Sequence, residues 1–103
     1  MSFERTLTIA HDHPALAGHF PGHPVVPGVL VLDEVIETLR LRYGQTLVVT
    51  ELPAVKLLSP LKPEESLNIM IEPEDARTAT FTCRAGGRVI ASGSLRFQLA
   101  VFP

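Results

Sequence analysis

Only one segment of this 103-residue chain has the periodicity of an α-helix, and this scarcity limits the folds open to it. The segment is residues 28–43, GVLVLDEVIETLRLRY. Pro27 suits the first turn of a helix, and Gly44 suits the position after its end. Because the first turn is apolar on all sides, we expect other structure to surround it. The predicted helix carries an apolar stripe at i, i+3, i+4 spacing, formed by Leu32, Val35, Ile36, Leu39 and Tyr43.

Most of the remaining chain has the patterns of β-strands. Apolar and polar residues alternate in four segments, and a fifth is rich in Val and Leu. Gly86-Gly87 indicates a tight hairpin, and prolines at 60 and 63 flank a turn. In the last strand the alternation assigns Val89 and Leu99 to the apolar face and Ile90 to the polar face. The five predicted strands cover residues 3–10, 46–58, 66–72, 78–85 and 88–99.

A sheet with one apolar face needs another layer to cover it, and the 28–43 helix is the one candidate in this sequence. We therefore expect an α+β fold in which a curled antiparallel sheet of about five strands wraps one long central helix. The length of 103 residues favours a single domain over 1–103 with a modest core, so a partner subunit would help to bury the rest.

The composition excludes several classes of protein. With 46% hydrophobic and 19% charged residues the chain is globular, and its scattered basic residues and net charge of −2 argue against nucleic-acid binding. The first residues lack the apolar core of a signal peptide, and the longest apolar stretch, 25–32, is too short to span a membrane. A single cysteine, Cys83, excludes an intrachain disulfide. We expect a cytoplasmic protein.

Residues 11–28 hold four His, four Pro and three Gly, a density of helix and strand breakers that predicts a structured loop. Within it lies the run GHFPGHPVVPG, residues 18–28. This run resembles the signature G-H-F-P-G-x-P-x-x-P-G of the hotdog-fold β-hydroxyacyl-acyl-carrier-protein dehydratases. The segment VKLLSPLKP, residues 55–63, is similar to the strand and turn that follow the helix in that family. The matching positions in the loop are Gly18, His19, Phe20, Pro21, Gly22, Pro24, Pro27 and Gly28.

The resemblance implies a catalytic pair. In that family it consists of the motif His and an acid on the helix 14 positions later, which are His19 and Asp33 here. The family holds the thioester carbonyl with the backbone N–H of the glycine that opens the helix, which corresponds to Gly28. Phe20 and Pro27 then lie beside the substrate. An Asp at this position is typical of members that also isomerise the double bond, an activity that one residue does not establish.

The chemistry of the residues agrees with this assignment. Dehydration of a 3-hydroxyacyl thioester needs a base for the α-proton, an acid for the departing hydroxyl and a donor for the enolate oxygen. A neutral His suits the base near neutral pH. Apolar neighbours around Asp33 would disfavour its charged form and suit the acid. A helix N-terminus offers N–H groups to a developing oxyanion. No cofactor and no metal is required.

Other interpretations of these residues stay open. His19 could instead hold the loop through backbone hydrogen bonds, and Asp33 could instead be a solvated acid beside Glu37. The spacing of the His residues and Asp12 fits no metal-ligand pattern that favours a metal site. His23 occupies a variable position of the motif and is read as a surface residue or a modest substrate contact. Three further residues, Cys83, Tyr43 and Phe81, are predicted to be core residues.

These observations predict an acyl-thioester dehydratase that acts on a substrate carried by acyl carrier protein or coenzyme A. The resemblance also implies a homodimer, in which two central helices pack together and each site takes His19 from one chain and Asp33 from the other. Two alternatives remain. One is a hotdog thioesterase, which does not need the His-Phe-Pro-Gly motif. The other is a non-catalytic acyl-binding subunit that assists a larger partner.

Overall fold

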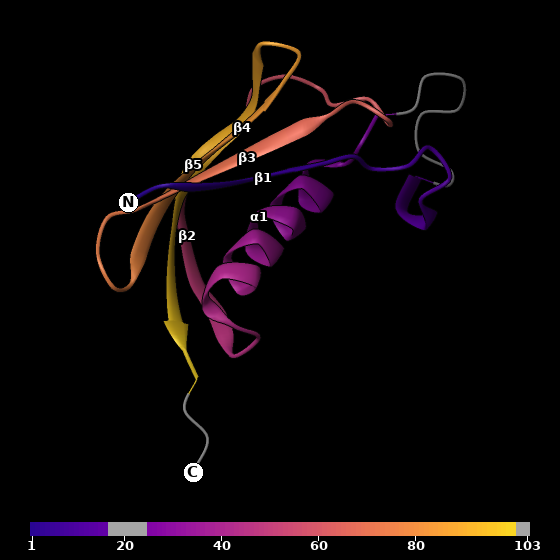
Figure 1. Cartoon of the computed structure of the whole chain (residues 1–103). Helices are drawn as coiled ribbons and strands as arrows, with labels where there is room; N and C mark the ends of the chain where they lie inside the picture. The colour runs from indigo at the N-terminus through magenta and orange to yellow at the C-terminus, as the bar shows by residue number, and fades with distance from the viewer. Residues whose placement is uncertain (17–24, 101–103) are drawn as a thin grey trace.

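The computed structural model describes residues 1–16 and 25–100, and the fold within these ranges is one helix against one sheet. Figure 1 shows the helix α1, Gly28–Tyr43, lying along one face of a sheet that bends around it. A short 3-10 turn, Pro14–Leu16, follows the first strand. The expected α+β arrangement is confirmed. The strands are β1 (Phe3–Leu7), β2 (Leu47–Leu57), β3 (Leu67–Pro73), β4 (Thr78–Ala85) and β5 (Arg88–Leu99).

The sheet has the order β1-β3-β4-β5-β2, and every neighbouring pair is antiparallel. The two glycines at 86 and 87 form the β4–β5 turn with positive φ values, as the hairpin prediction required. The strands β1 and β2 are the edges. Pro53 lies within β2, where an edge position tolerates the missing N–H. The register of β2 against β5 shifts twice, between Val49 and Glu51 and between Glu51 and Ala54.

The core lies between the sheet and α1. The alternation predicted for β3 and β4 is confirmed, because every second residue of these strands is buried. The helix stripe differs from the prediction by a rotation of the buried face, since Val31 and Thr38 are buried while Leu32 and Ile36 are only half-buried. The largest side chains that are almost fully buried are Phe81, Leu39, Leu47, Leu61, Leu67, Ile69, Ile71 and Leu95.

A bulge in β5 overturns the predicted faces at its start. Cys83 pairs with Ala91 and Arg84 pairs with Val89, so Ile90 is the extra residue. Ile90 is therefore buried rather than on the polar face, and Val89 lies opposite the exposed Arg84. At the other end of the strand Leu99 lies on the predicted apolar face, since it pairs with the buried Leu47, but it is about half exposed.

A partly buried polar contact ties the helix to the first edge strand. Arg5 of β1 lies 3.2 Å from the Glu34 carboxylate, and its Nη1 also donates to the Thr38 hydroxyl at 3.4 Å. The Thr38 hydroxyl in turn donates to the backbone carbonyl of Glu34 at 2.7 Å, so this buried polar side chain is satisfied. In the described ranges, no helix has the length and apolar character needed to cross a membrane.

Candidate active site

An apolar cleft of about 290 Å³ opens beside the first turn of α1. One side of the cleft is formed by the chain that enters α1, and the other by the segment that leaves β2. The bulged residue Ile90 of β5 also lines the cleft. The cleft is lined by Val25, Val26, Gly28, Val31, Leu57, Leu58, Ser59, Pro60, Leu61 and Ile90. Its shape and lining suit an apolar ligand segment.

Gly28 lies at the meeting point of the helix and the cleft. A Cβ atom at this position would lie 2.6 Å from Cδ1 of Leu57, so only glycine permits the present packing of that leucine. Pro27 precedes it with φ −59° and ψ 141°, and its carbonyl accepts from the N–H of Leu30 at 3.0 Å. Since proline has no polar side chain to cap a helix, the N–H groups of Gly28 and Val29 remain available to a ligand.

Backbone hydrogen bonds hold the cleft wall at 58–61 on both sides. The carbonyl of Ile90 accepts from the N–H groups of Leu58 and Ser59, at 2.9 and 3.3 Å. The carbonyl of Leu61 accepts from the Val26 N–H at 2.8 Å. The wall therefore connects β5 directly to the chain that enters α1.

Asp33 lies on a different side of the helix from Gly28. Five residues along an α-helix correspond to a rotation of about 140°, so this acid does not line the cleft of its own chain. It is exposed and shares its helix face with Val29, which is 67% exposed. The apolar surroundings expected for Asp33 are therefore not formed by this chain alone. Among the described residues it has no hydrogen-bond or ion-pair partner, whereas the adjacent Glu34 is held by Arg5.

His19 and Phe20 lie outside the described residues, as does His23, so the structure places neither the expected base nor its neighbour. Three of the residues weighed as metal ligands, His11, Asp12 and His13, are described. His11 donates its backbone N–H to Glu64 at 2.9 Å, and its ring Nδ1 lies 3.1 Å from the same carboxylate oxygen. These contacts hold the pKa of Glu64 below its ordinary value. Among the residues described, no group of three or more His, Cys, Asp or Glu is arranged to hold a metal ion.

Sequence reasoning found the helix start but missed the opposite wall of the cleft. Leu57 and Leu58 appear in the sequence as ordinary strand residues, and Ile90 falls on the wrong face because nothing in the alternation marks the bulge. The prolines at 60 and 63 were the available signal, since they mark where β2 ends and the chain turns across the helix start.

Comparison with known proteins gives a consistent result. A family model described as ApeI-like, ApeI dehydratase, matches residues 1–94. The chain is 28% identical over 109 residues to the 3-hydroxyacyl-[acyl-carrier-protein] dehydratase FabZ of Roseiflexus castenholzii, covering 95% of this chain and 75% of the relative. A second FabZ, from Granulibacter bethesdensis, is 27% identical over 87% of this chain, and the match spans 59% of that relative's length.

Solved structures share the fold. The dehydratase heterocomplex ApeI:P from Xenorhabdus doucetiae matches with a TM-score of 0.81 and 23% identity, over 93% of this chain and 86% of that chain. An acyl-CoA hydrolase from Staphylococcus aureus matches with a TM-score of 0.69 and 16% identity, over 97% and 65% of the two chains. The expected hotdog fold is thereby confirmed. Because dehydratases and a thioester hydrolase share it, the fold alone does not select the reaction.

Proposed function

The chain belongs to the ApeI-like dehydratase family, and we propose that it removes water from a 3-hydroxyacyl thioester to give the trans-2-enoyl thioester. The observation that carries this proposal is the apolar cleft that opens at the start of α1, beside Gly28. An apolar cleft suits the acyl chain, and a helix N-terminus suits the carbonyl oxygen that gains negative charge. The reacting groups would thus meet where the two features adjoin.

Each group has one role in the proposed reaction. His19 accepts the proton from C2 of the substrate, and Asp33 donates a proton to the departing C3 hydroxyl, so that water leaves as the double bond forms. The backbone N–H of Gly28 and the positive end of the helix dipole stabilise the enolate oxygen. Phe20 and Pro27 border the substrate. The reaction is balanced by these protons alone and uses no cofactor.

We propose a substrate linked to acyl carrier protein or coenzyme A, in fatty-acid synthesis or a related polyene or polyketide synthesis. The named relatives support an acyl-carrier-protein substrate, since both FabZ proteins carry it in their names. The corresponding location is the cytoplasm.

We further propose a homodimer in which the site is shared. The face of α1 that carries Asp33 also exposes Val29 and Leu41, at 67% and 63%, and exposed apolar side chains on one helix face favour a partner there. The same arrangement would bring the Asp33 of one chain to the cleft of the other. The relative from Xenorhabdus doucetiae is a heterocomplex, so the mass of the purified protein should decide between a dimer of this chain and dependence on another subunit.

One assay tests the reaction against its alternatives. The protein is incubated with crotonyl and 3-hydroxybutyryl thioesters of coenzyme A and of acyl carrier protein, while enoyl absorbance and free thiol are followed. A dehydratase changes enoyl absorbance in both directions and releases no thiol. Release of thiol would instead identify a thioesterase, and no change in either signal would identify a non-catalytic acyl-binding subunit.

A further inference from the structure

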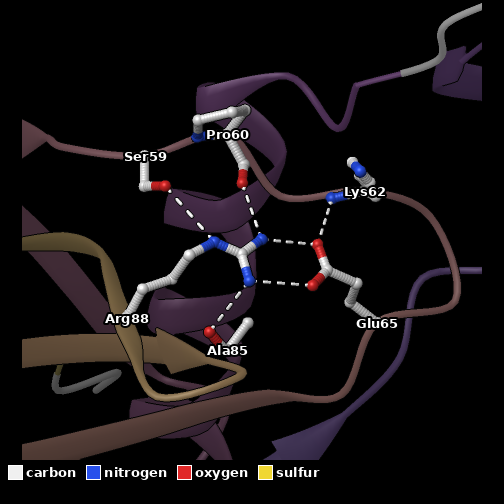
Figure 2. Close-up of polar contacts among 6 residues, drawn as sticks. All are labelled: Ser59, Pro60, Lys62, Glu65, Ala85 and Arg88. Atoms are coloured by element: carbon white, nitrogen blue, oxygen red, sulfur yellow. Dashed lines mark hydrogen bonds and ion pairs between the residues drawn. The ribbon is translucent and has the colours of Figure 1, made fainter.

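Arg88 forms the densest polar contact among the described side chains, at the turn between β4 and β5. Figure 2 shows its guanidinium group between the β4–β5 turn and the segment that follows β2. Nε donates to the Ser59 hydroxyl at 3.3 Å, and Nη1 donates to Glu65 at 2.9 Å and to the Ala85 carbonyl at 3.1 Å. Nη2 donates to Glu65 at 2.6 Å and to the Pro60 carbonyl at 3.0 Å. All five N–H donors of the group are used.

Glu65 binds the Arg88 guanidinium group from the other side. Its two carboxylate oxygens face the two terminal nitrogens of Arg88, which is the bidentate geometry that only arginine supplies. One of these oxygens also accepts from the backbone N–H of Lys62 at 2.8 Å. The Arg88 guanidinium lowers the pKa of Glu65 to about 2, so the carboxylate stays charged over the whole neutral range. We call these two side chains, Arg88 and Glu65, the clasp.

The clasp holds the wall of the cleft described above. Ser59 and Pro60, which receive two of its hydrogen bonds, both line the cleft. The next residue, Leu61, is almost fully buried and accepts from the Val26 N–H. Val26 lies two residues before Gly28, where α1 begins. Two hydrogen bonds, from Arg88 to Pro60 and from Val26 to Leu61, therefore connect Arg88 through short stretches of backbone to the helix start.

We propose that Arg88, held by Glu65, is a positioning residue that fixes the 59–61 wall and, through it, the chain that enters α1 at Gly28. This inference rests on the proposed function for its effect on catalysis. The clasp side chains remain 37% and 27% exposed, and partly exposed ion pairs contribute little to stability by themselves. Two of the hydrogen bonds of Arg88, however, go to the backbone carbonyls of Ala85 and Pro60, and these bonds constrain the path of the chain.

The same strand offers a matched control. Arg96 also lies on β5 and also faces a glutamate, Glu51, but at 3.8 Å and with both side chains more than half exposed. It does not line the cleft. Arg96→Gln thus removes the same charge from the same strand without touching the wall.

The first test is kinetic. For hydration of crotonyl-coenzyme A, we expect Arg88→Gln to lower kcat/KM about 10- to 100-fold, since small displacements of positioned groups have effects of that size. A rise in KM should account for part of it, because a displaced wall holds the acyl chain less well. A smaller folded fraction would lower only the apparent kcat and leave KM unchanged. Arg88→Lys should recover part of the loss, and Arg96→Gln should match the unmodified protein.

The second test does not depend on activity. Amide hydrogen exchange is measured on Arg88→Gln, Arg88→Lys and Arg96→Gln. The proposal requires faster exchange at Val26 and across 58–62 in Arg88→Gln, a smaller increase in Arg88→Lys and no increase in Arg96→Gln. Unchanged exchange at Val26 would overturn it, as would faster exchange in an enzyme whose KM and kcat are both unchanged. If Arg88→Gln does not fold, Arg88→Lys carries the same comparison. If the unmodified protein hydrates no thioester, the proposed reaction is wrong, and the exchange data still decide whether the clasp fixes the helix start.

Discussion

The two ends of α1 are built differently. At its start, Val29 is exposed, no side chain of Pro27 caps the helix, and an apolar cleft opens beside Gly28. At its end, the ring of Tyr43 packs between those of Phe3 and Phe97, with centroids 5.9 and 5.4 Å away.

The end of the helix is also closed by polar contacts. Gly44 has φ 110° and donates its N–H to the Arg40 carbonyl at 2.8 Å, which terminates the helix. Arg40 donates from Nε to the Leu47 carbonyl at 3.4 Å. Arg42 lies over the rings of Phe3 and Tyr43 at 5.8 and 5.5 Å. The turn into β2 is thereby held by the helix itself.

The difference indicates which end of α1 serves the stability of the fold and which end serves binding. The closed end packs the ring of Tyr43 between two others and terminates on the hydrogen bond from Gly44 to Arg40, so it serves stability. The open end leaves N–H groups, an acid and apolar surface unused by this chain, which is what a binding site needs. Changes at the open end should therefore affect activity, and changes at the closed end should affect folding.

The largest expected effect is on activity at the open end. Asp33→Asn should lower the rate of thioester hydration by about 10²–10⁴, the usual cost of losing a general acid or base, and His19→Ala should do the same. Because Asp33 is exposed, the melting temperature of the Asp33→Asn variant should equal that of the unmodified protein. Asp33→Glu should keep part of the activity. Glu37→Gln, one turn further along the helix, is the control, and an Asp33→Asn variant as active as this control would remove Asp33 from the mechanism.

Toward the closed end of α1, Leu39→Ala should destabilise the fold by about 2–5 kcal/mol, as expected for a large buried side chain. The measurement is chemical denaturation followed by circular dichroism. Leu99→Ala removes the same atoms from a half-exposed position and should cost far less. Equal losses of stability in the two variants would mean that Leu39 is not more deeply buried than Leu99.

Mixing two inactive variants tests whether the open end is completed by a second chain. Random pairing of His19→Ala and Asp33→Asn subunits after refolding makes about half the dimers mixed, each with one intact site, so roughly a quarter of the original activity should return. If both residues came from one chain, every site would still lack one group. Background activity in heterodimers verified by mass spectrometry would therefore rule out the shared site and leave the proposed reaction standing.

The clasp should give a smaller, pH-dependent effect on stability. Its contacts depress the pKa of Glu65 from 4.5 to about 2, so the stabilisation is present above pH 4.5 and is lost as the pH falls toward 2. The difference in melting temperature between the unmodified protein and Glu65→Gln should accordingly shrink over that interval. Glu51→Gln, which loses the longer and more exposed ion pair, is the control. A difference that stays constant down to pH 2 would contradict the assignment.

The smallest expected signal concerns Cys83, which lies in the core on β4. Burial raises the pKa of its thiol to about 12, so little thiolate exists near neutral pH. The native protein should label very slowly with a thiol reagent at about pH 8, while the unfolded protein labels fully. Rapid labelling without denaturant would show that this part of the sheet opens readily.

Much of the fold was predictable because the local patterns agree with it. The alternation in β3 and β4 identifies their buried residues, and Gly86-Gly87 identifies the hairpin. The prediction is wrong at Ile90, where a bulge adds a residue and reverses the faces. Leu99 lies on the predicted face but is about half exposed, because it is near the strand end with too little structure over it. Neither feature follows from alternation, since both depend on how β5 pairs with its neighbours.

The candidate site divides in the same way. From the sequence alone came the motif, the helix start at Gly28 and the acid at Asp33, because these are local features of one segment. Only the tertiary structure brought Leu57, Ser59 and Ile90 to that helix start. It also joined Arg88 to Glu65, 23 positions earlier in the chain. Such contacts arise from strand pairing between distant segments, and periodicity within a segment carries no information about which distant segment will lie against it.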